Sequence, residues 1–324
     1  MNKELSEFIL QTTQATSISK TELVQSLWSG YGELLRVHLK NSIYPSVIVK
    51  NIQPPSRSSH PRGWNTDISH QRKLTSYEVE LNWYENHNKS LKNHPKTPDL
   101  IGSQRSESGA VFILEDLNSV GYHIRKSYVS DLEINNCIQW LAQFHAKGFK
   151  SKPEGLWKIG CYWHLDTRPD ELEQLTDIQL KEAAPTIDEA LNSAKYLTIV
   201  HGDAKLANFC FSEQGEVAAV DFQYTGGGCG MKDLVYFLGS CLSEDECETH
   251  NEALLNLYFS NLKTAIEEEA LTIDFKELET EWRALFPVAW ADFHRFLKGW
   301  SPGHWKINSY SERITREVIE QLNK

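Results

Sequence analysis

The sequence of 324 residues lacks several features that would assign it to a class at once. Its six cysteines form no Cys-x-x-Cys pair, which argues against zinc fingers, thioredoxin-like chemistry and a secreted disulfide framework. No apolar run approaches the roughly 20 residues of a membrane span, and the N-terminus lacks the uninterrupted apolar stretch of a signal peptide. We therefore expect a soluble, cytoplasmic protein.

Positive charge is also scarce, with 33 Lys and Arg against 44 Asp and Glu and a net charge of −11. A broad phosphate-binding face would have to form against this field, so we expect neither a nucleic-acid partner nor a membrane partner. A chain of this length suffices for about two domains and needs no disulfide or structural metal to bury a core. No feature of the sequence specifies an oligomeric state.

Strand patterns dominate the first part of the chain. Apolar runs and alternating apolar residues predict strands at 23–28, 33–39, 46–52 and 110–117. Residues 53–73 are rich in Pro, Ser, Gly and Asn, which predicts an irregular surface loop whose arginines could contact phosphate. Helical spacing follows at 74–91. We expect an N-terminal lobe of strands with one helix.

Helical patterns dominate the rest of the chain. Ser130-x-x-Glu133 has the form of a capping box, and further amphipathic helices are expected at 134–149, 171–196 and 250–271. Between the last two, residues 209–222 alternate around a Ser-Glu-Gln-Gly turn and predict a β-hairpin. The glycine-rich residues 226–230 are interpreted as a flexible loop or a plain connection. The second lobe should therefore be mainly helical.

The residues with the clearest chemical pattern lie at the two ends of this hairpin. His201-Gly202-Asp203-Ala204-Lys205-Leu206-Ala207-Asn208 precedes it, and Asp221-Phe222-Gln223 ends it. Phosphoryl transfer to a hydroxyl needs a carboxylate beside the attacking oxygen and oxygen ligands for Mg²⁺. Asp203 can accept the proton, Asn208 and Asp221 can bind the metal, and Lys205 can reach the γ-phosphate. Taken alone, the first motif is also compatible with an ordinary turn.

This ordered pair of motifs resembles the kinase-like small-molecule phosphotransferases, the aminoglycoside phosphotransferase and choline kinase group. Asp221-Phe222-Gln223 and the run from Lys232 to Leu238 most resemble the ecdysteroid-kinase-like branch, and the resemblance extends over about 23–242. It implies a two-lobed, protein-kinase-like α+β fold, with lobes at 1–117 and 118–324. It also implies an enzyme that binds ATP and Mg²⁺ between the lobes and phosphorylates a hydroxyl of a small molecule.

The resemblance assigns roles to residues of the first lobe. Lys50 at the end of a strand corresponds to the lysine that contacts the α- and β-phosphates. Its glutamate partner on the following helix should be Glu80, with Glu78 as the alternative. Gly30 and Gly32 lie where a backbone can close over phosphates, although a tight turn also requires glycine.

Two further sets of residues follow from the resemblance. Glu115 and Leu117 correspond to the hinge, where a backbone carbonyl and a backbone amide meet the adenine edge. Asp233 corresponds to a helix aspartate that supports the catalytic loop.

The acceptor pocket is the least defined part of the prediction. Aromatic residues at 290–296 and 300–305 either line it or belong to a helix core, and His304 is either a pocket group or a surface histidine. His201-Gly202 stands where protein kinases have His-Arg, and Gln223 replaces a glycine, which disfavours a protein kinase. The remaining alternative is a non-catalytic, pseudokinase-like nucleotide-binding sensor or scaffold. The identity of the acceptor does not follow from the sequence.

Overall fold

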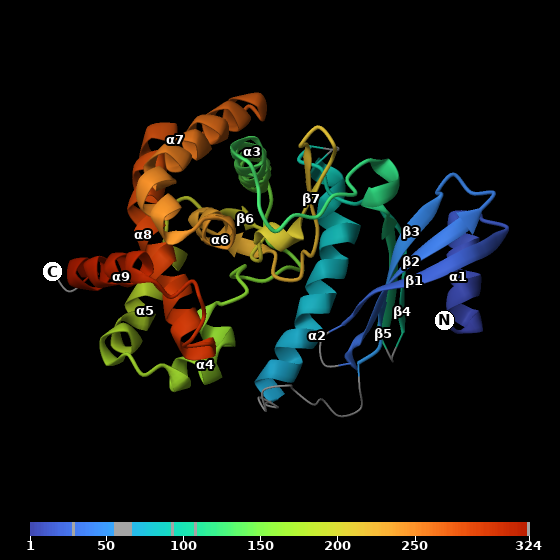
Figure 1. Ribbon diagram of the computed structural model, residues 1–324, viewed down its shortest axis with the longest axis horizontal. Coiled ribbons are helices and arrows are strands. Elements are labelled where there is room, and N and C mark those ends of the chain that lie inside the picture. The colour runs from blue at the N-terminus through green and yellow to red at the C-terminus, as the bar shows by residue number, and fades with distance from the viewer. Residues whose placement is uncertain (28–29, 55–66, 92–93, 107–108, 323–324) are drawn as a thin grey trace.

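The computed structural model has the two-lobed α+β architecture expected from the sequence (Figure 1). It describes residues 1–27, 30–54, 67–91, 94–106 and 109–322. A five-stranded antiparallel sheet forms the first lobe, and the second lobe is mainly helical. No helix within these ranges is long and apolar enough to cross a membrane.

The sheet has the strand order β1-β2-β3-β5-β4. Its strands are β1 (Ser17–Ser26), β2 (Gly32–Lys40), β3 (Ser46–Ile52), β4 (Leu100–Ser106) and β5 (Gly109–Glu115). The first strand thus begins earlier than predicted, its predicted end at Trp28 lies outside the described residues, and β4 was not predicted.

The two faces of the sheet have different neighbours. One face packs against α1 (Lys3–Thr13), another element that was not predicted, with Leu5 and Ile9 against Val47 and Val49. Because side chains alternate along a strand, Lys50 points to the opposite face. That face is directed toward α2 and the second lobe.

Helix α2 (Asp67–Asn82) lies between the sheet and the helical lobe (Figure 1). Its first two turns, 67–73, were expected to be an irregular loop, and the remainder of that expected loop, 55–66, lies outside the described residues. The α-helix ends at Asn82 instead of 91, and a π-helical turn (Trp83–His87) and a 3-10 turn (Asn88–Leu91) follow.

Helix α2 contacts both lobes. Its Glu80 forms an ion pair with Lys50 of β3. At its C-terminal end, Asn82 Nδ2 donates a hydrogen bond of 3.0 Å to the carbonyl oxygen of Gly155 in the second lobe. The helix therefore completes the sheet on one side and is attached to the helical lobe on the other.

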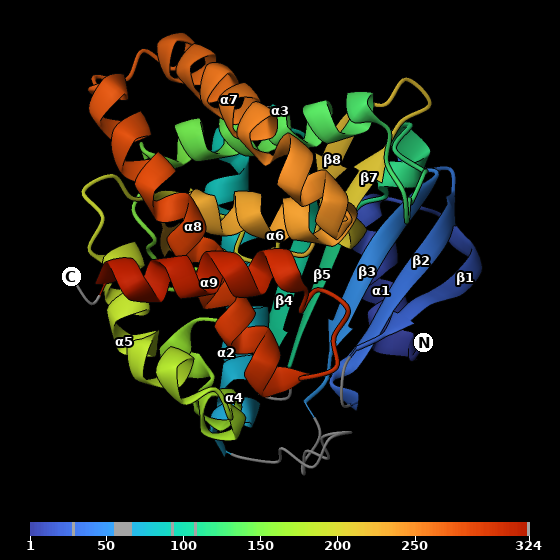
Figure 2. The same ribbon diagram turned by 60° about the vertical axis from the view of Figure 1, so that its left-hand side comes forward.

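The helical lobe contains seven of the helices that the structure describes. They are α3 (Asp131–Gly148), α4 (Pro169–Gln174), α5 (Ile178–Asn192), α6 (Met231–Cys241), α7 (Glu244–Glu268), α8 (Phe275–Trp300) and α9 (Ser309–Leu322). The capping box of Ser130 and Glu133 forms at the start of α3 as predicted. The single helix expected at 171–196 is two helices, and α7 begins earlier than 250. Figure 2 shows α6 and α8 between the pair α3 and α7 and the pair α4 and α5.

Two small strand pairs carry the motif-bearing segments. The predicted hairpin is present as β7 (Phe209–Phe211) and β8 (Val217–Ala219). The glycine-rich segment is not a flexible loop, because β9 (Gly226–Gly228) pairs with β6 (Thr198–Val200). A Cβ atom at Gly226 would lie 2.1 Å from the carbonyl oxygen of Trp157. Glycine is required there by this close backbone approach.

Candidate active site

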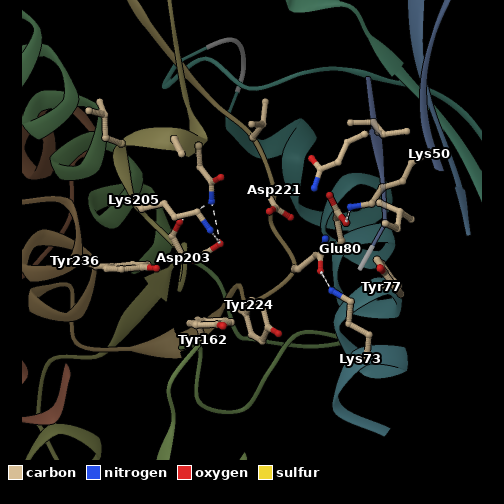
Figure 3. Close-up of a pocket in the computed structure, with 18 of the residues that line it drawn as sticks. Lys50, Lys73, Tyr77, Glu80, Tyr162, Asp203, Lys205, Asp221, Tyr224 and Tyr236 are labelled. Atoms are coloured by element: carbon tan, nitrogen blue, oxygen red, sulfur yellow. Dashed lines mark hydrogen bonds and ion pairs between the residues drawn. The ribbon is translucent and has the colours of Figure 1, made fainter. Parts of the chain in front are cut away.

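Most of the residues singled out in the sequence line one cavity of about 1090 Å³ between the sheet, α2 and the helical lobe. The members of this set that line it are Lys50, Glu80, Glu115, Leu117, Asp203, Lys205, Asn208 and Asp221. In Figure 3, Asp221 lies between Asp203 on one side and the Lys50–Glu80 pair on the other. The fold thus brings together side chains from β3, α2 and the hairpin of the second lobe.

Gly30 and Gly32 are not among the described residues that line the cavity, whereas Tyr31 between them is. Both glycines have a positive φ, +78° at Gly30 and +129° at Gly32. A Cβ atom at Gly32 would lie 2.0 Å from the carbonyl oxygen of Asn51, so the pairing of β2 with β3 requires glycine there. This geometry supports the tight-turn alternative for the two glycines.

Lys50 and Glu80 form a buried ion pair, with exposed fractions of 5% and 2%. The Nζ atom of Lys50 also lies 5.4 Å from the ring centre of Tyr77. Burial raises the pKa of Glu80 to about 7, although the charge of Lys50 opposes this shift. The alternative partner, Glu78, instead pairs with Arg105 at 3.1 Å.

Asp203 has one engaged and one unpaired carboxylate oxygen. Its Oδ2 accepts hydrogen bonds from Lys205 Nζ at 2.8 Å and from Asn208 Nδ2 at 3.0 Å. Its Oδ1 is buried and has no hydrogen-bond partner in the described part of the chain. Lys205, expected to reach a phosphate, therefore lies against the carboxylate of Asp203. Burial would lower the pKa of Lys205, but the charges of Asp203 and Asp221 outweigh it and raise the pKa.

The backbone before Asp203 is fixed by Asp233 of α6. The two carboxylate oxygens of Asp233 accept hydrogen bonds from the backbone amides of His201 at 2.6 Å and Gly202 at 2.8 Å. His145 Nε2 of α3 lies 3.1 Å from the same carboxylate. Asp233 thus has the supporting contacts that the sequence led us to expect.

Asp221 follows β8 in an unusual backbone conformation, with φ +70°, which non-glycine residues rarely adopt. Its Oδ1 is buried and has no hydrogen-bond partner among the described residues. Burial alone would raise the pKa of Asp221, but the charges of Lys50, Lys205 and Lys73 outweigh it and hold the pKa below its usual value. The carboxylate is therefore kept charged by cations that surround it.

The donor set of this loop fits a hard divalent cation. Asp203 and Asp221 each present an unpaired oxygen, and both hydrogen bonds of the Asn208 amide are donated by Nδ2, which leaves Oδ1 as a ligand atom. Within the described ranges, no group of three or more His, Cys, Asp and Glu could hold a metal by itself. Mg²⁺ commonly binds through one or two carboxylates and completes its octahedron with water and phosphate oxygens.

The segment expected to be the hinge lies where the chain leaves the sheet. Glu115 pairs with Lys96 at 2.6 Å, and Leu117 is buried at the first position of a 3-10 turn (Leu117–Val120). Between them, Asp116 also lines the cavity and accepts a hydrogen bond of 2.7 Å from Arg36. The sequence reasoning did not single out Asp116 or Arg36.

The opposite end of the cavity contains further residues that the sequence reasoning missed. They are Tyr162, Arg168, Tyr224, Tyr236 and Lys306. Two residues of α2 also line the cavity: Arg72, one of the arginines of the loop expected at 53–73, and Lys73, whose Nζ lies 4.8 Å from the ring centre of Tyr77. Of the aromatic residues proposed for the opposite end, Phe293, Phe296, Trp300 and Trp305 line the cavity together with His304. Trp290 does not. It packs against Tyr310, as the helix-core alternative implies.

Comparison with known proteins supports the resemblance inferred from the motifs. Residues 160–270 match the model of the ecdysteroid kinase-like family, about a third of the chain. No curated protein matches the chain by sequence.

Solved structures match over almost the whole length. Choline kinase LicA from Streptococcus pneumoniae has a TM-score of 0.54 and 13% identity and covers 99% of both chains. Amicoumacin kinase hAmiN, in complex with AMP-PNP, Ca²⁺ and Ami, has a TM-score of 0.58 and 14% identity and covers 99% of this chain and 96% of that one. The chain thus has the fold of the kinase-like small-molecule phosphotransferases, and it resembles the ecdysteroid kinase-like family over residues 160–270.

Proposed function

We propose that the protein is a Mg-ATP-dependent phosphotransferase that phosphorylates a hydroxyl group of a small molecule. The observation that carries this proposal is the pair of carboxylates, Asp203 and Asp221, each with a buried unpaired oxygen in one cavity. The likeness in fold to a choline kinase and to an amicoumacin kinase in complex with AMP-PNP supports it.

In this proposal one part of the cavity holds the nucleotide. Lys50, oriented by its ion pair with Glu80, binds the α- and β-phosphates. The backbone of Glu115 and Leu117 binds the adenine edge. Asp221 and Asn208 would hold Mg²⁺, which would supply positive charge against the β- and γ-phosphates.

Asp203 is the base in the transfer step. Its free Oδ1 accepts the proton of the acceptor hydroxyl as the hydroxyl oxygen attacks the γ-phosphorus. The new O–P bond forms while the bond between the γ-phosphorus and the bridging oxygen breaks, and ADP leaves with that electron pair. Lys205 holds Oδ2 of Asp203 and keeps the carboxylate oriented.

The test combines ligand binding and turnover. Saturating Mg-ATP at about 100 times its Kd should stabilise the wild type by roughly 2.7 kcal/mol, read as a thermal shift. The Mg-dependent part of this shift should disappear in Asp221→Ala. Asp203→Ala should retain the shift but lose on the order of 10²–10⁴ in turnover on a panel of sugars, amino alcohols, aminoglycosides and steroid alcohols.

Glu213→Ala is the matched control, because this carboxylate lies on the turn of the same hairpin and its side chain is 68% exposed. It should leave both readouts unchanged. If no nucleotide causes a thermal shift, the proposal that the protein binds ATP is contradicted. A Mg-dependent shift without phosphate transfer to any hydroxyl compound would favour the non-catalytic nucleotide-binding alternative.

A further inference from the structure

The far end of the cavity combines rings and cations. We call Tyr162, Tyr236, Phe293, Phe296 and Trp300 the aromatic wall. The guanidinium carbon of Arg168 lies 4.2 Å from the ring centre of Tyr162 and 5.3 Å from that of Phe296. Lys306 Nζ lies 5.1 Å from the ring centre of Tyr236 and 5.4 Å from that of Phe293. A cation therefore flanks the aromatic wall at each end.

Arg168 is buried with one nitrogen unsatisfied. Its side chain lines the cavity, and the residue is 4% exposed. Nε donates to the carbonyl oxygen of Tyr162 at 2.8 Å, and Nη1 donates to Glu171 at 3.1 Å. Nη2 is buried and has no hydrogen-bond partner in the described part of the chain. A buried donor left unpaired is costly, and more so when the group is charged.

A second arginine increases the positive charge at this place. Arg72 of α2 donates hydrogen bonds to the carbonyl oxygen of Thr167 and to the hydroxyl of Ser69. Burial lowers the pKa of Arg72, and the neighbouring charge of Arg168 lowers it further. Glu171 is the carboxylate that interacts with both guanidinium groups.

Positive side chains outnumber carboxylates in the cavity. Among the described residues that line it there are five Asp and Glu against eight Lys and Arg, although the whole chain has a net charge of −11. Those five are Glu80, Glu115, Asp116, Asp203 and Asp221. They belong to the ion pair with Lys50, the segment at the end of β5 and the motif-bearing loop. Of these five, Asp203 lies beside Tyr236 of the aromatic wall (Figure 3), where it is paired with Lys205 and is the proposed base. A cationic acceptor would also meet the like charges of Arg168 and Lys306 at the two ends of the wall.

We propose that the acceptor is an alcohol with a ring body that carries an anionic group, a carboxylate, sulfate or phosphate. Arg168 and Arg72 bind the anionic group, the ring lies against the aromatic wall, and the hydroxyl reaches Asp203. The identification of this molecule as an acceptor rests on the proposed phosphotransferase function. The anion site itself rests on the unsatisfied guanidinium nitrogen and the excess of positive charge.

The experiment measures binding to the protein saturated with Mg²⁺ and AMP-PNP. Its probes are 4-methylbenzoate, 4-methylbenzamide and 4-methylbenzylamine, which share one ring and differ in charge. They lack a hydroxyl and cannot be phosphorylated on one, so NMR titration measures their affinity for the anion site alone. The benzoate should bind at least tenfold more tightly than the amide, and the amine should bind most weakly.

Three variants locate the site. Arg72→Gln should reduce the preference for the benzoate at least tenfold. The double variant Arg168→Gln/Glu171→Gln should do the same, because it removes the cation without leaving Glu171 unpaired. Arg125→Gln is the matched control, since Arg125 lines the cavity but donates to the backbone carbonyl of Tyr122 and to Oδ1 of Asn118, in the segment that follows β5.

Two results would overturn the anion site. One is equal or tighter binding of the amide or the amine. The other is an unchanged benzoate preference in Arg72→Gln together with weaker AMP-PNP binding, which would assign the arginines to the nucleotide phosphates. Transfer of phosphate to 4-(hydroxymethyl)benzoate is measured separately. A benzoate preference without this or any other transfer would contradict the phosphotransferase while retaining the anion site.

Discussion

His294 is a buried titratable residue of the helical lobe, 1% exposed. Its Nδ1 lies 2.8 Å from the hydroxyl oxygen of Thr315, and its Nε2 lies 3.5 Å from Glu312. Burial lowers the pKa of His294 to about 4, although the charge of Glu312 opposes the shift. The folded protein therefore keeps this imidazole neutral in a pH range where an unfolded chain protonates it.

The pKa of His294 predicts a loss of stability in mild acid. A histidine in the unfolded chain titrates near pH 6.5, so protons bind the unfolded state preferentially as the pH falls from 6.5 toward 4. Between pH 7 and pH 5 this group should remove about 2 kcal/mol from the free energy of unfolding, while Glu80, whose pKa is raised to about 7, acts in the opposite direction in wild type and variant alike. Urea unfolding at the two pH values should show that the change in the free energy of unfolding from pH 7 to pH 5 is less unfavourable in His294→Gln than in the wild type, by about 2 kcal/mol. An equal loss in the variant and the wild type would contradict the assignment.

The motif residues could be predicted because they are close in sequence. Asp203 and Asn208 belong to one loop, and a short hairpin returns the chain to Asp221. Arg168 could not be found in this way, and Arg72 was included only among the arginines of the loop expected at 53–73. The two arginines come from different elements, and the importance of Arg168 depends on a missing hydrogen-bond partner, which only the packed structure reveals.

At the scale of elements, the structure around β9 predicts that one methyl group added at Gly226 strongly destabilises the protein. A Cβ atom at Gly226 would lie 2.1 Å from the carbonyl oxygen of Trp157, and a backbone oxygen cannot move away as a flexible side chain can. Gly226→Ala should lower the free energy of unfolding by about 3 kcal/mol, the upper end of the usual cost of overpacking. Urea unfolding measures this change.

Gly303→Ala is the control for this substitution. A Cβ atom at Gly303 meets nothing within 4 Å among the described residues. The control should change stability by less than about 0.5 kcal/mol. If the two variants are equally stable, the segment at 226–228 can move to accept the added methyl group. This would contradict the prediction and agree with the flexible-loop interpretation.

The elements that were predicted correctly are those with the strongest local sequence pattern. The strands β2, β3 and β5 and the capped helix α3 have long alternating or amphipathic patterns. Three-residue strands such as β6 and β9 are too short to show a period, and their pairing is a tertiary contact. The start of α2 was missed because residues 67–73 offer few apolar side chains and follow a loop-like composition.

At the scale of the whole molecule, α2 should make the two lobes unfold together. It carries Glu80, the partner of Lys50 in the sheet, and Asn82, which is attached to the second lobe through Gly155. Unfolding of the sheet would therefore leave Glu80 without the charge of Lys50, and unfolding of the second lobe would remove the hydrogen bond of α2 to Gly155. Differential scanning calorimetry should show one transition, with equal calorimetric and van't Hoff enthalpies. Two resolved transitions would contradict this coupling.

The reversal of charge between exterior and cavity also affects how an anionic ligand arrives. Such a ligand first meets the repulsive field of a chain with net charge −11. It meets attraction at the cavity, where eight Lys and Arg outnumber five Asp and Glu among the lining residues that the structure describes. Salt at 0.1 M screens exposed charges beyond about 10 Å and screens buried ones much less. Added salt should therefore speed entry into the cavity more than it shortens the residence time there.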